Sequence, residues 1–251
     1  MKSRIRGSSW LRDIGKREYA AGIIKGILLY GAVIYLFYGS ALPALFLIPL
    51  WGVYMKQWAE DMTSKKEAEF RNQFRDCIQA MSAALKAGYS AENAIRETKR
   101  DIAPMYSPDK RIMKELRLMV HQIEMNRPVG QVLEEFSERA GQEDVENFVH
   151  VFNAAKKSGG DSISMIRRAV RVISEKIDTE KEIQTMLASK KLEFDIMCAV
   201  PLVIILYMKM TFGGFLDALY GNAAGVAVMT ICLILYTGAY LLGRKLIRIE
   251  V

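Results

Sequence analysis

The hydrophobic positions of this chain form two long blocks that flank a polar middle. The first block covers residues 20–55 and the second covers residues 196–242, whereas almost every charged residue lies between the blocks or at the two ends. A bilayer core is about 30 Å thick, and an α-helix crosses it with about 20 apolar residues. The pattern therefore predicts an integral membrane protein with a polar central domain.

Each block is long enough for two membrane-spanning helices. Gly39 and Ser40 divide the first block into a helix over residues 20–38 and a short second helix over residues 41–55. The second block, within residues 196–243, predicts helices over 196–208 and 223–242, joined by a short outer loop that contains Gly213, Gly214 and Gly221. A signal peptide is not expected, because 19 mostly polar residues precede the first block and no small-residue cleavage pattern ends a short run.

Basic residues indicate the orientation of these four predicted spans. They cluster in the N-terminal segment 1–19, at Lys65 and Lys66, at Lys190 and Lys191, and in the C-terminal tail 244–251, whereas the two outer loops hold one lysine between them. Cytoplasmic loops carry the excess of lysine and arginine in membrane proteins. We therefore expect both termini and the central domain, residues 56–195, to lie in the cytoplasm.

The net charge of +7 does not indicate a nucleic-acid partner. Residues 56–195 carry 24 basic and 24 acidic residues, so the excess positive charge lies beside the membrane segments. A phosphate-binding groove needs clustered positive charge within the folded domain. The three cysteines include no CxxC pair, which argues against a disulfide framework and suits a cytosolic domain.

The central domain shows helical periodicity throughout. Apolar residues recur every three or four positions in residues 70–85 and again in residues 145–155, at Phe70, Phe74, Cys77, Ile78, Met81 and Leu85 and then at Val145, Phe148, Val149, Phe152 and Ala155. Gly88 is expected to end the first of these helices and Ser90 to cap the next. Residues 71 positions later, Gly159, Gly160 and Asp161, supply the same turn and cap.

This correspondence predicts two pseudo-repeated helical hairpins within a six-helix cytoplasmic bundle. Six of the 14 residues in 83–96 are identical to residues 71 positions later. Between the hairpins, one helix is expected to begin with a cap at Ser107 and Pro108, and another to end at Gly141. The last helix, from Ser162, has no breaker before the membrane and is expected to continue into the third span, where Pro201 predicts a kink. The fold class is therefore all-α.

Residues that could carry chemistry are few, and no catalytic, cofactor-binding or metal site is predicted. The lysines in KKSGGDS precede the glycines, which is the reverse of a phosphate-binding loop. His121, Glu124 and His150 provide too few ligands for zinc, and Cys77 has no visible activating base. Glu134, Glu135 and Glu138 belong to an acidic run that forms either a solvated helix face or part of a partner surface.

Residues 70–204 resemble the type II secretion system F domain, a family of platform proteins shared by type II secretion, type IV pili and tight-adherence (Tad or Flp) pili. The resemblance is carried by FRDCIQAMSAALKAGYSAENAI, by GQVLEEFSERAGQEDVENFVHVFNAAKKSGGDSISMIRRAV and by IQTMLASKKLEFDIMCAVPLVI. A single domain between two pairs of spans is similar to the Tad proteins TadB and TadC. The segment ISEKIDTEKEIQ departs from the arginine-rich run common in TadB-like members, so the choice between the two subfamilies stays open.

The resemblance implies a non-enzymatic platform in the bacterial inner or plasma membrane, without a cofactor. Its expected partners are a cytoplasmic secretion ATPase, pilin subunits and a second platform protein in an oligomeric assembly. An alternative hypothesis is the membrane subunit of a small-molecule transporter. Transporters usually carry polar or charged residues in their spans, and these spans hold little beyond Lys25.

Overall fold

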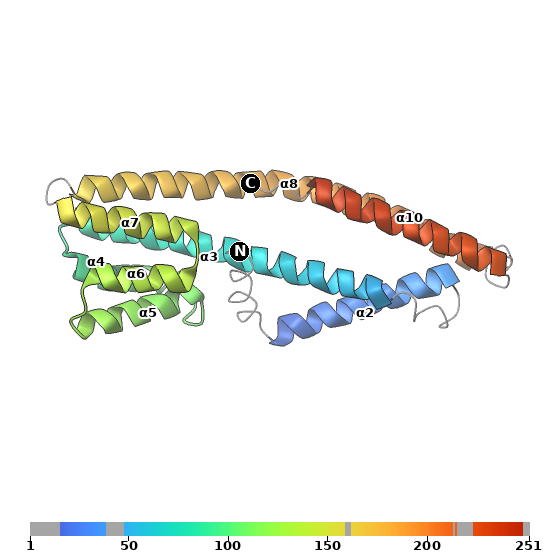
Figure 1. Cartoon of the computed structure of the whole chain (residues 1–251), viewed down its shortest axis with the longest axis horizontal. Helices are drawn as coiled ribbons and strands as arrows, with labels where there is room; N and C mark the ends of the chain where they lie inside the picture. The colour runs from blue at the N-terminus through green and yellow to red at the C-terminus, as the bar shows by residue number, and fades with distance from the viewer. Residues whose placement is uncertain (1–15, 39–47, 159–161, 213, 215–222, 248–251) are drawn as a thin grey trace. The chain divides into compact units, whose positions relative to one another are not determined.

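The protein is all-helical in the residues that its computed structural model describes, which are 16–38, 48–158, 162–212, 214 and 223–247. Eight helices and no strand occur in this part of the chain (Figure 1). The helices are α2 (Lys16–Tyr38), α3 (Ile48–Lys86), α4 (Ala91–Ile102), α5 (Arg111–Glu124), α6 (Val129–Ala140), α7 (Glu143–Ser158), α8 (Ser162–Thr211) and α10 (Ala223–Ile247).

The described residues form two compact units. One, which we call the bundle unit, contains residues 63–181, and the other, the span unit, contains residues 16–62 and 182–247. Helices α3 and α8 contribute residues to both units. The bundle unit lies inside the stretch 56–195 that the sequence marks as the central domain.

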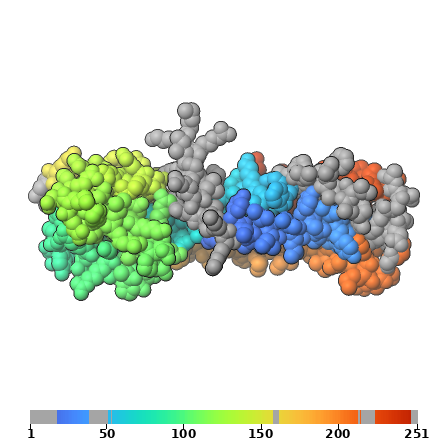
Figure 2. All heavy atoms as spheres, turned by 90° about the horizontal axis from the view of Figure 1, so that it is seen from below, coloured from blue at the N-terminus to red at the C-terminus, as the bar shows by residue number. Residues whose placement is uncertain are grey.

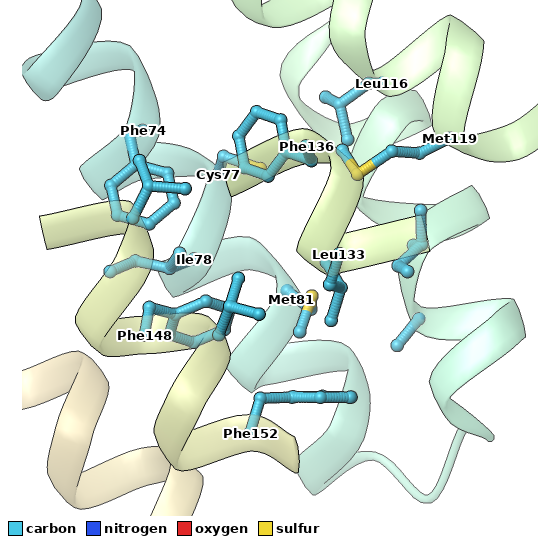
Figure 3. Close-up of a cluster of buried hydrophobic side chains, with 14 of the residues drawn as sticks. Phe74, Cys77, Ile78, Met81, Leu116, Met119, Leu133, Phe136, Phe148 and Phe152 are labelled. Atoms are coloured by element: carbon cyan, nitrogen blue, oxygen red, sulfur yellow. The ribbon is translucent and has the colours of Figure 1, made fainter. Parts of the chain in front are cut away.

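The bundle unit has one hydrophobic core, to which all of its helices contribute. The apolar positions predicted on α3 and α7 are buried, as are Ile166, Val170, Ile173 and Ile177 of α8, which confirms the helical periodicity. Aromatic rings occupy the centre of this core (Figure 3). The ring of Phe74 meets that of Phe148 edge-on, with their centroids 5.9 Å apart, and lies 6.2 Å from that of Phe136.

Hydrogen-bonded caps define the ends of several helices. At the end of α3, Tyr89 N–H donates to Ala84 O and Gly88 N–H to Leu85 O, which is the Schellman arrangement, and Gly88 has the positive φ of +91° that it requires. The Ser90 hydroxyl accepts a hydrogen bond from Asn93 N–H at the start of α4. Helix α6 ends at Gly141, as predicted, with φ of +61°. The predicted turn at Gly159, Gly160 and Asp161 lies outside the described residues.

The expected start of the fifth helix is wrong by three residues. The sequence places a cap at Ser107 and Pro108, but α5 begins at Arg111 after the extended residue Lys110. Lys110 N–H donates to Ser107 O, so Ser107, Pro108 and Asp109 form a separate turn. Proline suits the second position of such a turn as well as the first position of a helix, and here the turn is adopted.

Three helices are long and apolar enough to cross a membrane: residues 18–38, the C-terminal part of α8, and residues 224–246. Helix α8 runs for 50 residues without interruption, which confirms that the last helix of the bundle continues into the third predicted span. The predicted second span, 41–55, begins outside the described residues, and from Ile48 its remainder forms the start of α3.

Packing within the span unit joins α2 to both α3 and α10. Trp58 of α3 meets Tyr19 edge-on at 5.7 Å, and a Cβ on Gly22 of α2 would lie 2.4 Å from the Trp58 ring, so the two helices approach closely. Figure 2 shows α2, in dark blue, lying against the light-blue part of α3. On α10, Met229 and Leu233 pack with Val33, Leu36, Phe37 and Tyr38 of α2.

Candidate functional site

The acidic side chains predicted as a partner surface lie on α6, and they differ in what they contact. Glu134 accepts a hydrogen bond from Asn153 of α7, at 2.8 Å. Glu135 accepts hydrogen bonds from Gln122 at 2.6 Å and from the Arg127 guanidinium at 3.1 Å. Glu138 is exposed and pairs with no other described residue.

The contacts of Glu135 make it a structural residue. Hydrogen bonds from Arg127 and Gln122, together with the charges of Arg127 and Arg139, hold the pKa of the Glu135 carboxyl below its usual value. Arg139 in turn donates to Glu115 of α5, at 2.9 Å. The cluster therefore links α5 to α6, and of the three predicted acids only Glu138 presents a carboxylate that the described residues leave for a partner.

A concave surface lies between α7 and α8 and has a volume of about 440 Å³. Asp144 at one end is 4% exposed and accepts a hydrogen bond from Lys176 at 2.8 Å, which raises the pKa of the lysine and keeps it charged. The remaining lining is largely apolar: Asn147, Val151, Met165, Arg168, Ala169, Val172 and Ile173. The surface therefore suits an apolar side chain better than a charged ligand.

A ladder of polar contacts fixes the register of α3 against α8 in the bundle unit. Arg71 is paired with Glu180, Arg75 with Asp178, and the Gln79 amide donates to the Ser174 hydroxyl at 3.1 Å. Residues further along α3 pair with residues earlier in α8, as expected for two antiparallel helices. The Arg71–Glu180 pair is partly buried, whereas Asp178 of the second pair is more than half exposed, so the first pair is screened less by solvent.

In the span unit, one carboxylate joins three helices. Asp61 of α3 is paired with Arg244 of α10, and its carboxylate lies 3.8 Å from the Lys191 ammonium of α8. Arg244 also donates to the Gln57 side chain. This junction lies just outside the apolar stretches of α8 and α10, where charged side chains are expected to reach water.

Cys77 and the histidines show no arrangement for chemistry. Burial raises the pKa of the Cys77 thiol to about 12, with a smaller contribution from the charge of Asp76, so the thiol stays protonated near neutral pH. His121, Glu124 and His150 are exposed side chains. Within the described ranges, no three histidine, cysteine, aspartate or glutamate side chains form a group suited to a metal ion.

Sequence reasoning missed the residues that connect the helices. Lys191 and Arg244 were counted only as charges that set the orientation, and Arg71, Asp61 and Glu180 had no assigned role. Their ion-pair partners lie between 109 and 183 positions away in the chain, so no local pattern reveals the pairs. Pro201, predicted as a kink, lies inside α8, which remains one helix across it.

A family model described as "Type II secretion system (T2SS), protein F" matches residues 77–209. The match contains most of the bundle unit, all of α8 up to Lys209, and Pro201. Neither the curated proteins nor the solved structures include a significant match to the chain.

Proposed function

The chain belongs to the type II secretion system protein F family, whose members are membrane platform proteins, and we propose that it is the platform of a Tad-type pilus machine. In this role it couples a cytoplasmic secretion ATPase to the assembly of pilin subunits and carries out no reaction itself. It acts together with a second platform protein, in the inner or plasma membrane, with both termini in the cytoplasm.

The observation that carries the coupling proposal is the continuity of α8. Residues Ile166, Val170, Ile173 and Ile177 of this helix are buried in the core of the bundle unit, and its C-terminal part is apolar enough to span a membrane. Because an α-helix satisfies its own backbone hydrogen bonds, it transmits a displacement along its axis without first refolding. A push or rotation on the bundle unit therefore reaches the membrane through one element.

The ladder between α3 and α8 supports the same role. Arg71 and Arg75 pair with acids on α8, so a displacement of one helix along its axis is shared with the other. A force delivered to the bundle unit is then carried by two helices rather than one.

For the ATPase contact, we favour the exposed carboxylate of Glu138 over its neighbours. Reversing the charge of Glu135 would break its pairs with Arg127 and Arg139 and loosen α5 from α6, so a loss of binding would be ambiguous. Glu138→Lys leaves those contacts in place. We expect it to weaken binding of the secretion ATPase at least about threefold, since one charge pair at an interface rim contributes modestly to affinity.

Glu124→Lys is the matched control for this variant. Glu124 is also an exposed glutamate, but it lies in the last turn of α5, where a lysine interacts favourably with the helix dipole. Equal ATPase affinity for wild type, Glu138→Lys and Glu124→Lys would remove Glu138 from the proposed contact.

The proposed role as a whole is tested by crosslinking in the native host, followed by purification of the full chain and mass spectrometry of what co-purifies. Recovery of a secretion ATPase with a pilin or a second platform protein is the expected result. Recovery of a substrate-binding protein or nucleotide-binding transport subunits, without a pilin, would instead favour the transporter hypothesis.

A further inference from the structure

The proline inside α8 removes one rung from the helix's own hydrogen-bond ladder. Pro201 has no backbone N–H, so the carbonyl of Met197, four residues earlier, loses its partner within the helix, and the proline ring crowds the carbonyls of that turn. In a bilayer such carbonyls are costly unless a neighbouring helix supplies a donor.

A neighbouring helix supplies a donor to the next carbonyl of this turn. The Tyr236 hydroxyl of α10 donates a hydrogen bond to the carbonyl oxygen of Cys198, at 2.5 Å. Cys198 directly follows the residue whose carbonyl the proline leaves unpaired. This phenol is therefore placed at the turn of α8 that lacks a backbone hydrogen bond.

Helix α10 contacts α8 on both sides of Pro201. On the N-terminal side, the rings of Phe194 and Tyr240 stack with their centroids 5.8 Å apart, and a Cβ on Gly243 would lie 2.3 Å from the Phe194 ring. On the C-terminal side, Leu202 and Ile205 pack against the cluster formed by α2 and α10.

The C-terminal side is also tied to α2. Lys209 donates a hydrogen bond to the Tyr35 carbonyl at 2.6 Å, near the end of α2, and its ammonium lies over the Tyr35 ring. The part of α8 that follows Pro201 is thus held by two helices. The part that precedes it contacts α10 through Phe194 and the Tyr236 hydroxyl, and further back Lys191 lies 3.8 Å from the Asp61 carboxylate of α3.

From this geometry we propose that Pro201 is a hinge in α8 and that Tyr236 is the latch that keeps the hinge in the conformation described. When the phenol hydrogen bond is released, the segment of α8 before Pro201 swings relative to α10 while the segment after it stays packed. This motion is internal to the span unit and does not depend on whether the protein serves a pilus machine.

The test uses spin labels attached to cysteines that replace Met186 of α8 and Leu246 of α10. The distance between the labels is measured by pulsed electron–electron double resonance on the full chain in lipid nanodiscs. Both side chains are well exposed, and both lie in the span unit. Cys198 and Cys232 are replaced by alanine in every sample, and the buried Cys77 is retained.

Tyr236→Phe keeps the ring and removes only the hydroxyl. We expect the width of the 186–246 distance distribution to increase about twofold. The amides of residues 202–205 donate across the hinge to the carbonyls of residues 198–201, so they should exchange about threefold faster, which corresponds to loss of one interhelical hydrogen bond in a membrane. Tyr207→Phe, which removes a hydroxyl from an exposed tyrosine of α8, should leave both readouts unchanged.

Pro201→Ala tests whether the effect of Tyr236 depends on the proline, as a latch requires, or reflects only general packing of the tyrosine. With an alanine, residue 201 again donates to Met197 and the ladder of α8 is complete, so adding Tyr236→Phe should no longer broaden the distribution. An unchanged distribution in Tyr236→Phe, or equal broadening with and without Pro201, would overturn the proposal.

Discussion

Phe74 lies at the centre of the aromatic cluster that joins α3 to α6 and α7. Its side chain is 1% exposed and contacts the rings of Phe136 and Phe148. Because a core this closely packed closes only partly around a deleted ring, Phe74→Ala should lower the free energy of unfolding of the bundle unit by about 3–5 kcal/mol.

Pulse proteolysis of the full chain in nanodiscs, over a series of urea concentrations, measures this change. Leu118→Ala is the control, because Leu118 is 39% exposed on α5 and its truncation should shift stability by no more than about 0.5 kcal/mol. Equal effects of the two substitutions would show that the cluster contributes no more than surface packing.

Glu135 should make the stability of the α5–α6 contact depend on pH. The hydrogen bonds from Arg127 and Gln122 lower its pKa in the folded protein, so its contribution is fully present above the pKa of the unfolded chain, about 4.3, and is lost as the pH falls from that value through the lower pKa of the folded protein. Glu135→Gln should therefore accelerate amide exchange of α6 at pH 7 and have a smaller effect at pH 3.

Hydrogen exchange with mass spectrometry, corrected for intrinsic rates, measures both conditions on the full chain. Glu138→Gln is the matched control, since Glu138 pairs with no other described residue, and it should not alter exchange at either pH. A difference between wild type and Glu135→Gln that persisted unchanged at pH 3 would contradict the pairing.

At the scale of residues, the sequence predicts which side chains are buried but not which polar groups meet. Phe70, Phe74 and Phe148 could be placed in the core because helical periodicity is local and depends on a few neighbouring positions. Asp61 and Arg244 are 183 positions apart. Their pairing follows from the packing of three helices, which no short stretch of sequence records.

At the scale of elements, the end of α3 depends on the backbone conformation of a single residue. Gly88 has φ of +91°, and nothing lies within 4 Å of the position a Cβ would occupy. Gly88→Ala therefore meets no clash, and its cost comes only from the left-handed backbone, about 1 kcal/mol. Lys86→Ala, two positions earlier at the exposed last residue of α3, should cost only a few tenths of this.

Urea unfolding by pulse proteolysis again gives the comparison. If Gly88→Ala were as stable as wild type, the Schellman arrangement at the end of α3 would not be what sets the turn into α4.

Helix ends at glycine were predicted, whereas the one at asparagine was missed, because the two residues differ in how strongly they favour a left-handed backbone. Gly141 ends α6 as expected, since few residues other than glycine readily adopt the left-handed backbone conformation at that position. Asn126 was missed, although it has φ of +59° and ends α5 with the same pair of backbone hydrogen bonds as Gly88. Asparagine tolerates this conformation but does not require it, so its presence in a sequence marks a helix end only weakly.

At the scale of the whole molecule, the coupling proposal requires α8 to be unbroken between its buried and its apolar parts. Ser189 lies in this stretch and is exposed. Ser189→Pro removes a backbone donor and distorts the preceding turn, at a cost of about 3 kcal/mol to the helix, without changing its length. We expect pilus assembly to fall at least about tenfold while the protein still reaches the membrane and still co-purifies with its ATPase.

Ser189→Ala is the control and should assemble pili at the wild-type level. Assembly is scored by counting surface pili and by immunoblotting sheared pilin. Normal assembly by Ser189→Pro, with the protein present in equal amounts, would mean that α8 does not carry the coupling.

The overall organisation could be predicted more completely than the individual contacts, because the distribution of apolar and polar residues along the chain is enough to separate its main parts. The all-helical class, the family and the continuity of α8 follow from patterns that extend over tens of residues. The number of spans could not be fixed in this way. The predicted second span is short, contains Pro43 and Pro49, and merges from Ile48 into the long amphipathic helix α3, so hydropathy gives it no clear end.

The contribution of α8 to the bundle core also has a consequence for biosynthesis. The core needs Ile166, Val170, Ile173 and Ile177, which are the last of its side chains to be made, and the same helix then supplies the next apolar span. A chain that ends after residue 158 therefore lacks the α8 side chains of this core, and its incomplete bundle is a substrate for chaperones and proteases. Completion of the bundle core and delivery of the third span to the membrane insertion machinery are thus consecutive steps in the synthesis of one helix.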